Sequence, residues 1–337
     1  MRSRLSHDIK AEAQRLGFFA CGIAQATAVE ETTAHSFREW LAQGYHAEMH
    51  YMENHLDKRL DPRLLMNGLK SIVCVALGYA PQQRIPDTEY QIAAYAYGHD
   101  YHDIVKEKLH ALATFITTRT DESFQYRVFS DSAPVLERYW AVQAGLGWIG
   151  HHHQLIIPHA GSMFFLGELF LDIDLEYNQP IENRCGTCRR CIDACPTGAL
   201  TASSSPNHTS DLNNDEDHVP TSLQGFDAER CLSYQTIENR GDIPSPLAMK
   251  MGQTIYGCDR CLLACPWNRF AKPTQEPMLQ PNEELLNMTK EQWNHLTEDD
   301  YRRLFKGSAV KRAKYSGLMR NIQAVNDNLE TTRHEND

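Results

Sequence analysis

The sequence lacks any long hydrophobic run. Its longest apolar stretch, at residues 71–80, is about half the length that a membrane-spanning helix needs, so no transmembrane segment is expected. The first 24 residues also lack the apolar core of a signal peptide and are typical of an amphipathic helix. We therefore expect a cytoplasmic protein that does not associate with membranes.

Positive charge is also scarce. The 337 residues include 33 Lys and Arg against 44 Asp and Glu, which gives a net charge of −11. This balance argues against a protein that binds nucleic acid through its overall charge, although it permits a local basic patch. No zinc-protease motif of the form HExxH is present.

Cysteine, by contrast, is abundant and clustered. Eight of the ten cysteines fall between residues 185 and 265. Disulfides are rare in a reducing compartment, so this cluster indicates metal binding or catalysis. The remaining two, Cys21 and Cys74, sit in apolar surroundings and are interpreted as core thiols rather than nucleophiles.

The clustered cysteines form two motifs that share a spacing. The first is Cys185-x2-Cys188-x2-Cys191-x3-Cys195-Pro, and the second is Cys258-x2-Cys261-x3-Cys265-Pro with Cys231 upstream. The first motif is the bacterial ferredoxin run, in which the fourth cysteine binds the other of two [4Fe–4S] clusters. Crossed ligation then predicts the following two ligand sets: Cys185, Cys188, Cys191 and Cys265 for one cluster, and Cys231, Cys258, Cys261 and Cys195 for the other. Two structural zinc sites are the alternative.

The segment before these motifs contains a misleading pattern. Gly145, Gly147 and Gly150 satisfy the dinucleotide fingerprint GxGxxG, but a helix predicted over residues 135–144 precedes them where a strand is required. We therefore reject a Rossmann site. Asp131 lies at the predicted entrance of that helix, with Ser132 as its expected cap. Asp131 is either a capping carboxylate or a general acid, and the residues alone leave both interpretations open.

The chain divides into three predicted regions. Residues 1–172 mix helical and strand patterns, including strands near 72–77, 125–129 and 162–173 and a helix over 101–118. Residues 173–275 hold the cysteines and a polar insertion at 201–222, and residues 276–337 are predicted to be helical.

Five segments together resemble one family, the epoxyqueuosine reductases. In chain order they are DSAPVLERYWAVQAGLGWIG, CGTCRRCIDACPTGAL, CLSYQTIENRGDIP, YGCDRCLLACPWNRF and GSAVKRAKYSGLMRN, and the resemblance runs over roughly residues 10–325. One departure stands out. The family usually continues GWIG with Lys-Asn, whereas this chain has His151, His152 and His153.

The resemblance implies a fold, a reaction and cofactors. The fold would be α+β, with an N-terminal α/β cobalamin-binding domain, a ferredoxin-like domain with two [4Fe–4S] clusters and a short helical C-terminal region. The reaction would be reduction of epoxyqueuosine to queuosine at the wobble position of tRNA. Asp131 matches the proton donor, and four further residues match positions near cobalamin: Arg59, His99, Cys258 and Asp259.

The resemblance also implies partners. A tRNA would contact the basic segment at residues 302–320, which contains seven basic residues and no acid. Its expected contacts are Lys311, Arg312, Lys314 and Arg320, with Tyr315 or Phe305 available to stack on a base. A flavodoxin or ferredoxin would supply electrons to a monomeric enzyme. The competing hypotheses are a cobalamin-dependent reductive dehalogenase acting on a small molecule and a two-cluster electron carrier.

Overall fold

The computed structural model describes residues 2–121, 123–201 and 225–334. At its centre lies a four-stranded sheet with the order β1-β2-β7-β4, in which every pair is antiparallel. Its strands are β1 (Ala20–Gln25), β2 (Ser71–Gly78), β4 (Tyr126–Phe129) and β7 (Phe164–Leu171). The three strands predicted from β-branched and apolar runs are confirmed. The mixed pattern of helices and strands expected for residues 1–172 is observed: α4 (Tyr101–Thr117) follows β2 and precedes β4, and these two strands run in the same direction on either side of β7.

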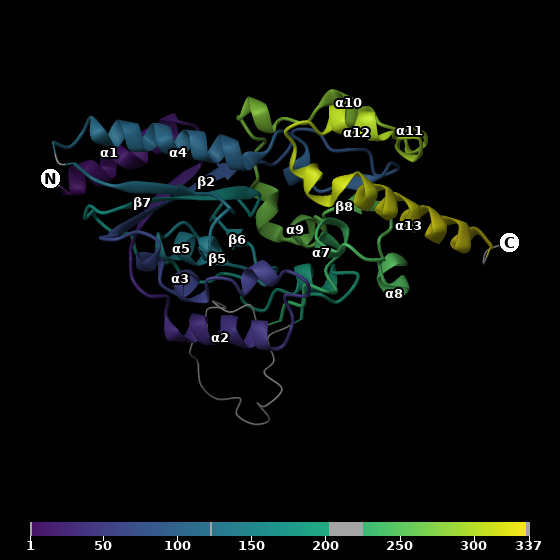
Figure 1. The fold of residues 1–337 in the computed structure, drawn as a ribbon, viewed down its shortest axis with the longest axis horizontal. Helices are drawn as coiled ribbons and strands as arrows, with labels where there is room; N and C mark the ends of the chain where they lie inside the picture. The colour runs from purple at the N-terminus through teal and green to yellow at the C-terminus, as the bar shows by residue number, and fades with distance from the viewer. Residues whose placement is uncertain (1, 122, 202–224, 335–337) are drawn as a thin grey trace, which may run out of the picture.

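Helices cover both faces of this sheet (Figure 1). On one face lie α1 (Arg2–Arg15) and α4 (Tyr101–Thr117), and on the other lies α5 (Glu137–Gln143). Alternate residues of β2 serve the two faces: Val73 and Val75 join the core under α1 and α4, whereas Ile72 and Cys74 join the core under α5. A strand buried on both faces needs apolar residues throughout, which explains the continuous run in the sequence.

The helix that follows Asp131 begins later than predicted. Its first residue is Glu137 and its N-cap is Leu136, which makes no side-chain capping bond, so the expected cap at Ser132 is wrong. Asp131 has a left-handed backbone with φ of 48°, which turns the chain out of β4 before the helix can start. After α5 the chain enters a strand rather than a helix, which confirms the rejection of a Rossmann site.

The cysteine region consists of short elements joined to the sheet domain. The strand β3 (Gln91–Ile92) pairs with β8 (Thr254–Tyr256), so residues before α4 and residues near the second motif share one two-stranded sheet. The other elements here are α6 (Arg190–Asp193), α7 (Leu232–Ile237), α8 (Ser245–Ala248) and α9 (Arg260–Ala264). Apart from its first residue, the polar insertion predicted at 201–222 lies outside the described residues.

The C-terminal region is helical, as the sequence predicts. Its helices are α10 (Glu283–Asn287), α11 (Lys290–Asn294), α12 (Glu298–Leu304) and α13 (Lys314–His334). One hydrophobic core contains Leu109, Tyr256 and Trp293, which come from all three predicted regions. The domain boundaries themselves stay predictions.

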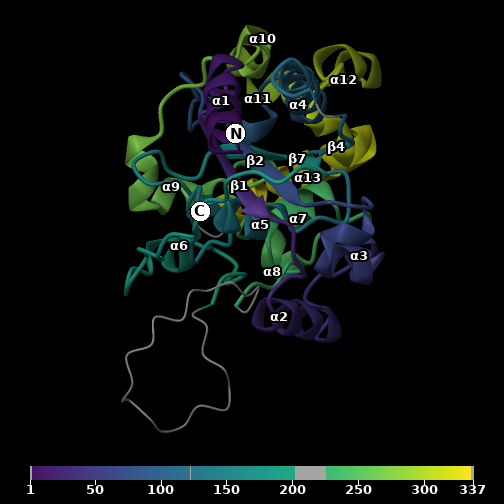
Figure 2. The ribbon, with the colours of Figure 1, turned by 90° about the vertical axis from the view of Figure 1, so that its left-hand side faces the viewer.

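Two further helices and a short two-stranded sheet complete the elements on this side of the molecule. They are α2 (Glu31–Ala42), α3 (Leu56–Leu60), β5 (Trp148–Ile149) and β6 (Leu155–Ile156). Figure 2 shows α2 and α3 on the side of the sheet opposite to α1 and α4. Among the described residues, no helix combines the length and the hydrophobicity that crossing a membrane would need.

Candidate active site and cluster sites

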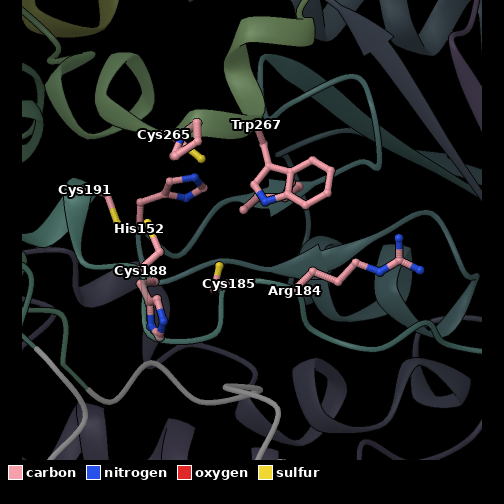
Figure 3. A pocket seen from close by; sticks show the side chains of 10 residues that line it. His152, Arg184, Cys185, Cys188, Cys191, Cys265 and Trp267 are labelled. Carbon is pink, nitrogen blue, oxygen red and sulfur yellow. The ribbon is translucent and has the colours of Figure 1, made fainter.

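Four cysteines from two distant motifs line one cavity. They are Cys185, Cys188 and Cys191 of the first motif and Cys265 of the second (Figure 3). The short helices α6 and α9 pack against each other and bring the two motifs together. Burial raises the pKa of Cys191 to about 11, and the neighbouring sulfurs of Cys265 and Cys185 contribute. These thiols therefore ionise more readily with a metal to neutralise them.

The other four cysteines also lie near one another. Burial raises the pKa of Cys231 to about 11, with contributions from Cys258 and Cys195, and it raises the pKa of Cys261 with contributions from Cys258 and Cys231. Burial opposes ionisation of Cys195 as well, but hydrogen bonds from Thr197 and from backbone N–H groups lower its pKa overall. Four converging sulfurs suit an iron–sulfur cluster or zinc, so both groups have the donor chemistry that a cluster needs.

Cys21 and Cys74 belong to neither group. Burial raises the pKa of Cys21 to about 12 and raises that of Cys74 well above its ordinary value. In the β1–β2 pair, Cys21 lies opposite Val75 and Cys74 lies opposite Gly22, so each cysteine faces a sequence neighbour of the other. Their interpretation as core thiols is consistent with this environment.

Asp131 projects from the loop after β4 into a polar cluster. Its side chain is 67% exposed, and its Oδ2 accepts a hydrogen bond of 2.6 Å from the hydroxyl of Tyr101. The backbone N–H of Asp131 donates to the carboxyl group of Glu137. Burial raises the pKa of Tyr101, and the carboxylate of Asp131 raises it further. Tyr101 therefore keeps its proton and holds the carboxylate in place.

A histidine connects Asp131 to a second carboxylate. The Nε2 of His102 lies 3.8 Å from Oδ2 of Asp131, and its Nδ1 lies 2.6 Å from Oδ1 of Asp100. The hydrogen bond with Asp100 raises the pKa of His102, although partial burial opposes it. His102 is thus placed between two carboxylates, which favour its protonated form.

Two further acidic side chains lie behind Asp131. Burial raises the pKa of Glu137 to about 8, and the charge of Asp131 adds to this effect. Burial also raises the pKa of Glu168, with a contribution from Glu137, and within the described part of the chain neither carboxyl oxygen of Glu168 meets the geometric criteria for a hydrogen bond. Glu168 on β7 is fully buried. Burial therefore favours the neutral, protonated form of both carboxyl groups.

Replacing Glu168 with methionine is expected to stabilise the protein at pH 8 by about 1–3 kcal/mol. Above the ordinary glutamate pKa of 4.5, the unfolded chain releases the protons of Glu137 and Glu168, whereas the folded protein keeps them. The free energy of unfolding therefore falls as pH rises from 4.5 through the folded pKa values. Denaturant unfolding at pH 5 and pH 8 measures the change, with the exposed Glu107→Met as the control. An unchanged pH dependence in the Glu168 variant would contradict this account.

A buried arginine contacts the loop that carries Tyr51. Arg59 is 7% exposed, donates to the carbonyl of Tyr51 over 3.1 Å and has a buried Nε without a partner among the described residues. Burial raises the pKa of Tyr51 to about 12, with contributions from the nearby carboxylates of Glu238 and Asp131. A buried cation with an unpaired N–H fits a ligand rich in hydrogen-bond acceptors, such as the amide and phosphate groups around a corrin.

Two other predicted cofactor contacts differ in their surroundings: His99 is exposed, whereas Asp259 bonds within the protein. His99 lies beside Gly307, two residues before Tyr101. The carboxylate of Asp259 accepts from the backbone N–H of Ala94 and pairs with Arg84 at 3.4 Å, so this side chain holds the neighbouring loop. Burial raises the pKa of Asp259.

The basic segment lies along the rim of this site. The carbonyl of Gly307 accepts from the N–H of Asp100, and the guanidinium of Arg312 pairs with Glu238 at 2.7 Å. Lys311 and Lys314 are exposed.

Three residues of the basic segment have structural roles instead. Arg320 donates to the carbonyls of Gln235 and Asn239 inside the fold. Phe305 is buried, so its predicted role in stacking on a base is wrong. Tyr315 donates to the carbonyl of Leu296, with its ring packed near Tyr301.

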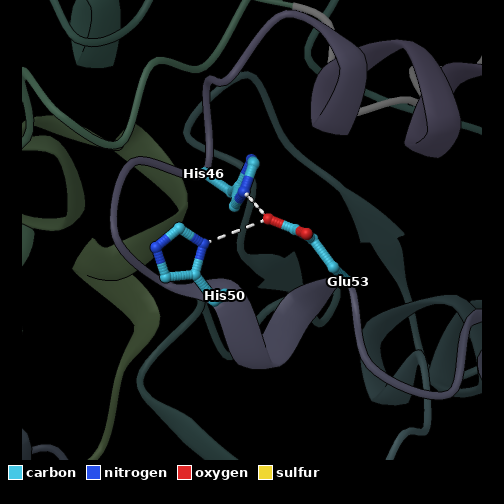
Figure 4. A group of neighbouring side chains, drawn as sticks. All are labelled: His46, His50 and Glu53. Carbon is cyan, nitrogen blue, oxygen red and sulfur yellow. Dashed lines mark hydrogen bonds and ion pairs between the residues drawn. The ribbon is translucent and has the colours of Figure 1, made fainter.

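A hydrogen-bonded trio stabilises the loop that carries Tyr51 (Figure 4). Glu53 Oε1 lies 3.2 Å from Nδ1 of His50 and 2.6 Å from Nε2 of His46, and these two bonds lower the pKa of Glu53. The same loop donates from the N–H of Glu48 to the hydroxyl of Tyr234, three residues after Cys231. The loop therefore joins the sheet domain to the second group of cysteines.

Comparison with known proteins identifies the family. Residues 59–132 match the model described as "Epoxyqueuosine reductase QueG, DUF1730", and residues 184–268 match the 4Fe-4S double cluster binding domain. An epoxyqueuosine reductase from Cellulophaga algicola is 46% identical over 93% of this chain and 95% of its own length. The chain belongs to the epoxyqueuosine reductase family. It is an oxidoreductase with a double [4Fe–4S] cluster domain, which makes the zinc alternative wrong.

Other members of the family extend the match. The epoxyqueuosine reductase of Leadbetterella byssophila is 43% identical over 96% of this chain and 98% of its own length. A solved epoxyqueuosine reductase in complex with an epoxyqueuosine-modified tRNA-Tyr stem loop has a TM-score of 0.81 and 26% identity, covering 96% of this chain and 80% of that one. A second from Bacillus subtilis has a TM-score of 0.80 and 26% identity, covering 96% and 81%.

Sequence reasoning missed several members of the site. Tyr101 and His102 were visible only as part of a polar run, GHDYH, and nothing in that run indicates that they face Asp131. Glu168 lies within an apolar strand, where a lone acidic residue is a usable signal of a buried functional carboxyl group. Tyr51 and Glu238 come from distant loops and gave no local signal.

Proposed function

We propose that this protein reduces epoxyqueuosine to queuosine at the wobble position of tRNA. In this proposal, electrons pass through two [4Fe–4S] clusters to a bound cobalamin, and Asp131 supplies a proton. The observation that carries the proposal is the exposed carboxylate of Asp131, held by Tyr101 beside the cysteine region in a member of this family. The solved relative in complex with a modified tRNA stem loop supports tRNA as the substrate.

The cluster ligands follow the crossed arrangement. We propose that one cluster is bound by Cys185, Cys188, Cys191 and Cys265, which line a single cavity. The other set would be Cys195, Cys231, Cys258 and Cys261, whose sulfurs influence one another electrostatically. Each set contains one cysteine from the opposite motif.

We propose that cobalamin binds beside Arg59 and Asp131. Arg59 would hold acceptor groups of the corrin with its unpaired N–H, and His99 and the backbone at Cys258 would lie near it. Asp259 would position the loop of Ala94 rather than bind the cofactor directly. When bound, cobalamin would supply a reduced cobalt ion able to deliver electrons to an epoxide.

The side chains around Asp131 donate and replace the proton that the reaction uses. Conversion of an epoxide to an alkene and water consumes two electrons and two protons, so the departing oxygen needs an acid. Tyr101 fixes the carboxyl group of Asp131 through a 2.6 Å bond, and Asp131 protonates the oxygen. His102, 3.8 Å away, then returns a proton to Asp131, and Asp100 stabilises the charged imidazole. The catalytic loop described for the Bacillus subtilis relative, which swings out of its active site, is consistent with an exposed acid.

Turnover is expected to fall as pH rises through the pKa of His102. Below that value the imidazole carries the proton that Asp131 needs, and above it the proton is lost. Asp100 raises this pKa, so Asp100→Asn should shift the alkaline limb of the profile to lower pH. Single-turnover rates between pH 6 and pH 10 measure the limb, with Asp103→Asn on the exposed side of α4 as the control. A limb that stays in place in the Asp100 variant would contradict the role of His102.

We propose that Lys311, Arg312 and Lys314 contact tRNA phosphates. The charge reversal of Lys311 and Lys314 together is expected to weaken binding of an anticodon stem loop and to reduce the salt dependence of the affinity by about two phosphate contacts. Binding is measured by fluorescence anisotropy from low to moderate salt. Reversal of Lys10 and Lys70 is the control, because Lys10 lies on α1 and Lys70 pairs with Asp174, and neither belongs to the basic segment. Equal affinities for both double variants and the unaltered protein would contradict this surface.

The proposal also covers the compartment, the oligomeric state and the electron donor. The enzyme would act as a cytoplasmic monomer and accept electrons from a flavodoxin or ferredoxin. A substrate panel tests the reaction: anaerobically reconstituted protein with a chemical reductant is offered an epoxyqueuosine-containing stem loop and a halogenated phenol. Conversion of the stem loop alone supports the proposal, whereas release of halide alone would favour a dehalogenase.

A further inference from the structure

His152 places an unpaired N–H at the first cluster site. It is 3% exposed and lines the cavity formed by Cys185, Cys188, Cys191 and Cys265. Figure 3 shows its imidazole among these sulfurs, on the side of Cys191 and Cys265. Its Nε2 is buried and has no partner among the described residues. A buried polar atom without a partner is rare and calls for a ligand.

The hydrogen bonding of the ring identifies which nitrogen carries the proton. The backbone N–H of Gln154 donates to Nδ1 of His152 over 3.1 Å, so Nδ1 must present its lone pair. In the neutral ring the proton is then on Nε2, the atom that faces the cavity without a partner. Gly150 lets the ring take this position, because a Cβ there would meet its Cε1 at 3.2 Å.

The two neighbouring histidines do not share this arrangement. His151 also lines the cavity, but it is only half-buried, and its Nε2 lies 3.3 Å from the carbonyl oxygen of Gly186. His153 packs its ring near Phe226 and does not line the cavity. Only the middle residue of the three is therefore both buried and directed at the cysteines.

We propose that His152 donates a hydrogen bond from Nε2 to a sulfur of the [4Fe–4S] cluster bound by Cys185, Cys188, Cys191 and Cys265, and so sets the reduction potential of that cluster. This inference rests on the proposed ligand set. Reduction adds one electron and makes the sulfurs more negative, so a hydrogen-bond donor favours the reduced state. The indole N–H of Trp148, 3.5 Å from the sulfur of Cys185, acts in the same direction.

Redox titration of three variants tests the proposal in the holoenzyme. His152→Phe keeps a ring of similar size and removes the donor, His152→Gln restores an N–H, and His153→Asn is the matched control outside the cavity. We expect His152→Phe to disfavour reduction of one cluster by roughly tenfold, which is ~59 mV for one electron, while the other cluster stays unchanged. His152→Gln should recover part of this shift, and His153→Asn should leave both potentials in place.

A spectroscopic measurement on the unaltered protein removes the dependence on variant folding. With ¹⁵N-labelled histidine, pulsed EPR of the reduced enzyme should detect a weak nitrogen coupling and an exchangeable proton at one cluster. Absence of both couplings, or an unchanged potential in a fully loaded His152→Phe protein, would overturn the proposal. Iron and sulfide analysis tests the ligand set separately: a protein that holds two clusters but shows no histidine coupling refutes the role of His152 alone.

Discussion

Replacing Asp131 with asparagine is expected to lower the rate of epoxyqueuosine reduction by about 10²–10⁴-fold, the usual contribution of a general acid. Asparagine keeps the size and polarity of the side chain but has no acidic proton to give. The hydroxyl of Tyr101 can still donate to the amide oxygen, so the loop should keep its position. The loss should therefore appear in the chemical step, which single-turnover kinetics on a modified stem loop measures.

Two controls separate this chemical role from a structural one. Asp103→Asn removes an exposed carboxylate two residues after Tyr101 and should leave the rate unchanged. Stem-loop affinity and the absorption of the clusters should be the same in Asp131→Asn as in the unaltered protein. A variant that reduces its substrate at the normal rate would eliminate Asp131 as the acid.

The second large effect concerns the exchanged cysteines. Cys265→Ala is expected to remove the cluster of the first motif, although Cys265 belongs to the second motif in the sequence. About half of the iron and sulfide should be lost, and turnover should fall to background because electrons no longer have a continuous route. Iron analysis and EPR of the reduced protein measure the loss. Cys21→Ala, outside both groups, should keep the full content.

Comparing the EPR signals lost in different cysteine variants shows which cysteines bind the same cluster. Cys265→Ala and Cys188→Ala should lose the same EPR signal, while Cys195→Ala and Cys258→Ala should lose the other. If Cys265→Ala instead matched Cys258→Ala, each motif would bind its own cluster and the crossed arrangement would be wrong.

Much of the fold was predictable because its signals are local. The strand at β2 has an uninterrupted apolar run, and α4 has helical spacing with a capping aspartate, Asp100, before it. The antiparallel order of the sheet was not predictable, because strand pairing depends on long-range packing. The late start of α5 also depends on a tertiary feature, the left-handed turn at Asp131.

Some features of the candidate site were also predictable from local sequence, and others depend on tertiary packing. The proposed cysteine sets follow from spacing, since the ferredoxin pattern predicts both the ligands and their exchange. Asp131 was recognised through its resemblance to the family, but its contacts with Tyr101 and His102 depend on how α4 packs against β7. Arg320 illustrates the opposite case: its charge suggested RNA, whereas the fold uses its guanidinium to bind backbone carbonyls.

The most direct test of the central claim is a single-turnover assay followed by mass spectrometry of the nucleosides. Protein loaded anaerobically with both clusters and cobalamin is reduced and mixed with a tRNA stem loop that contains epoxyqueuosine. The account predicts stoichiometric conversion to queuosine, and none when cobalamin is omitted. Unchanged epoxyqueuosine with the fully loaded, reduced protein, or equal conversion without cobalamin, would contradict it.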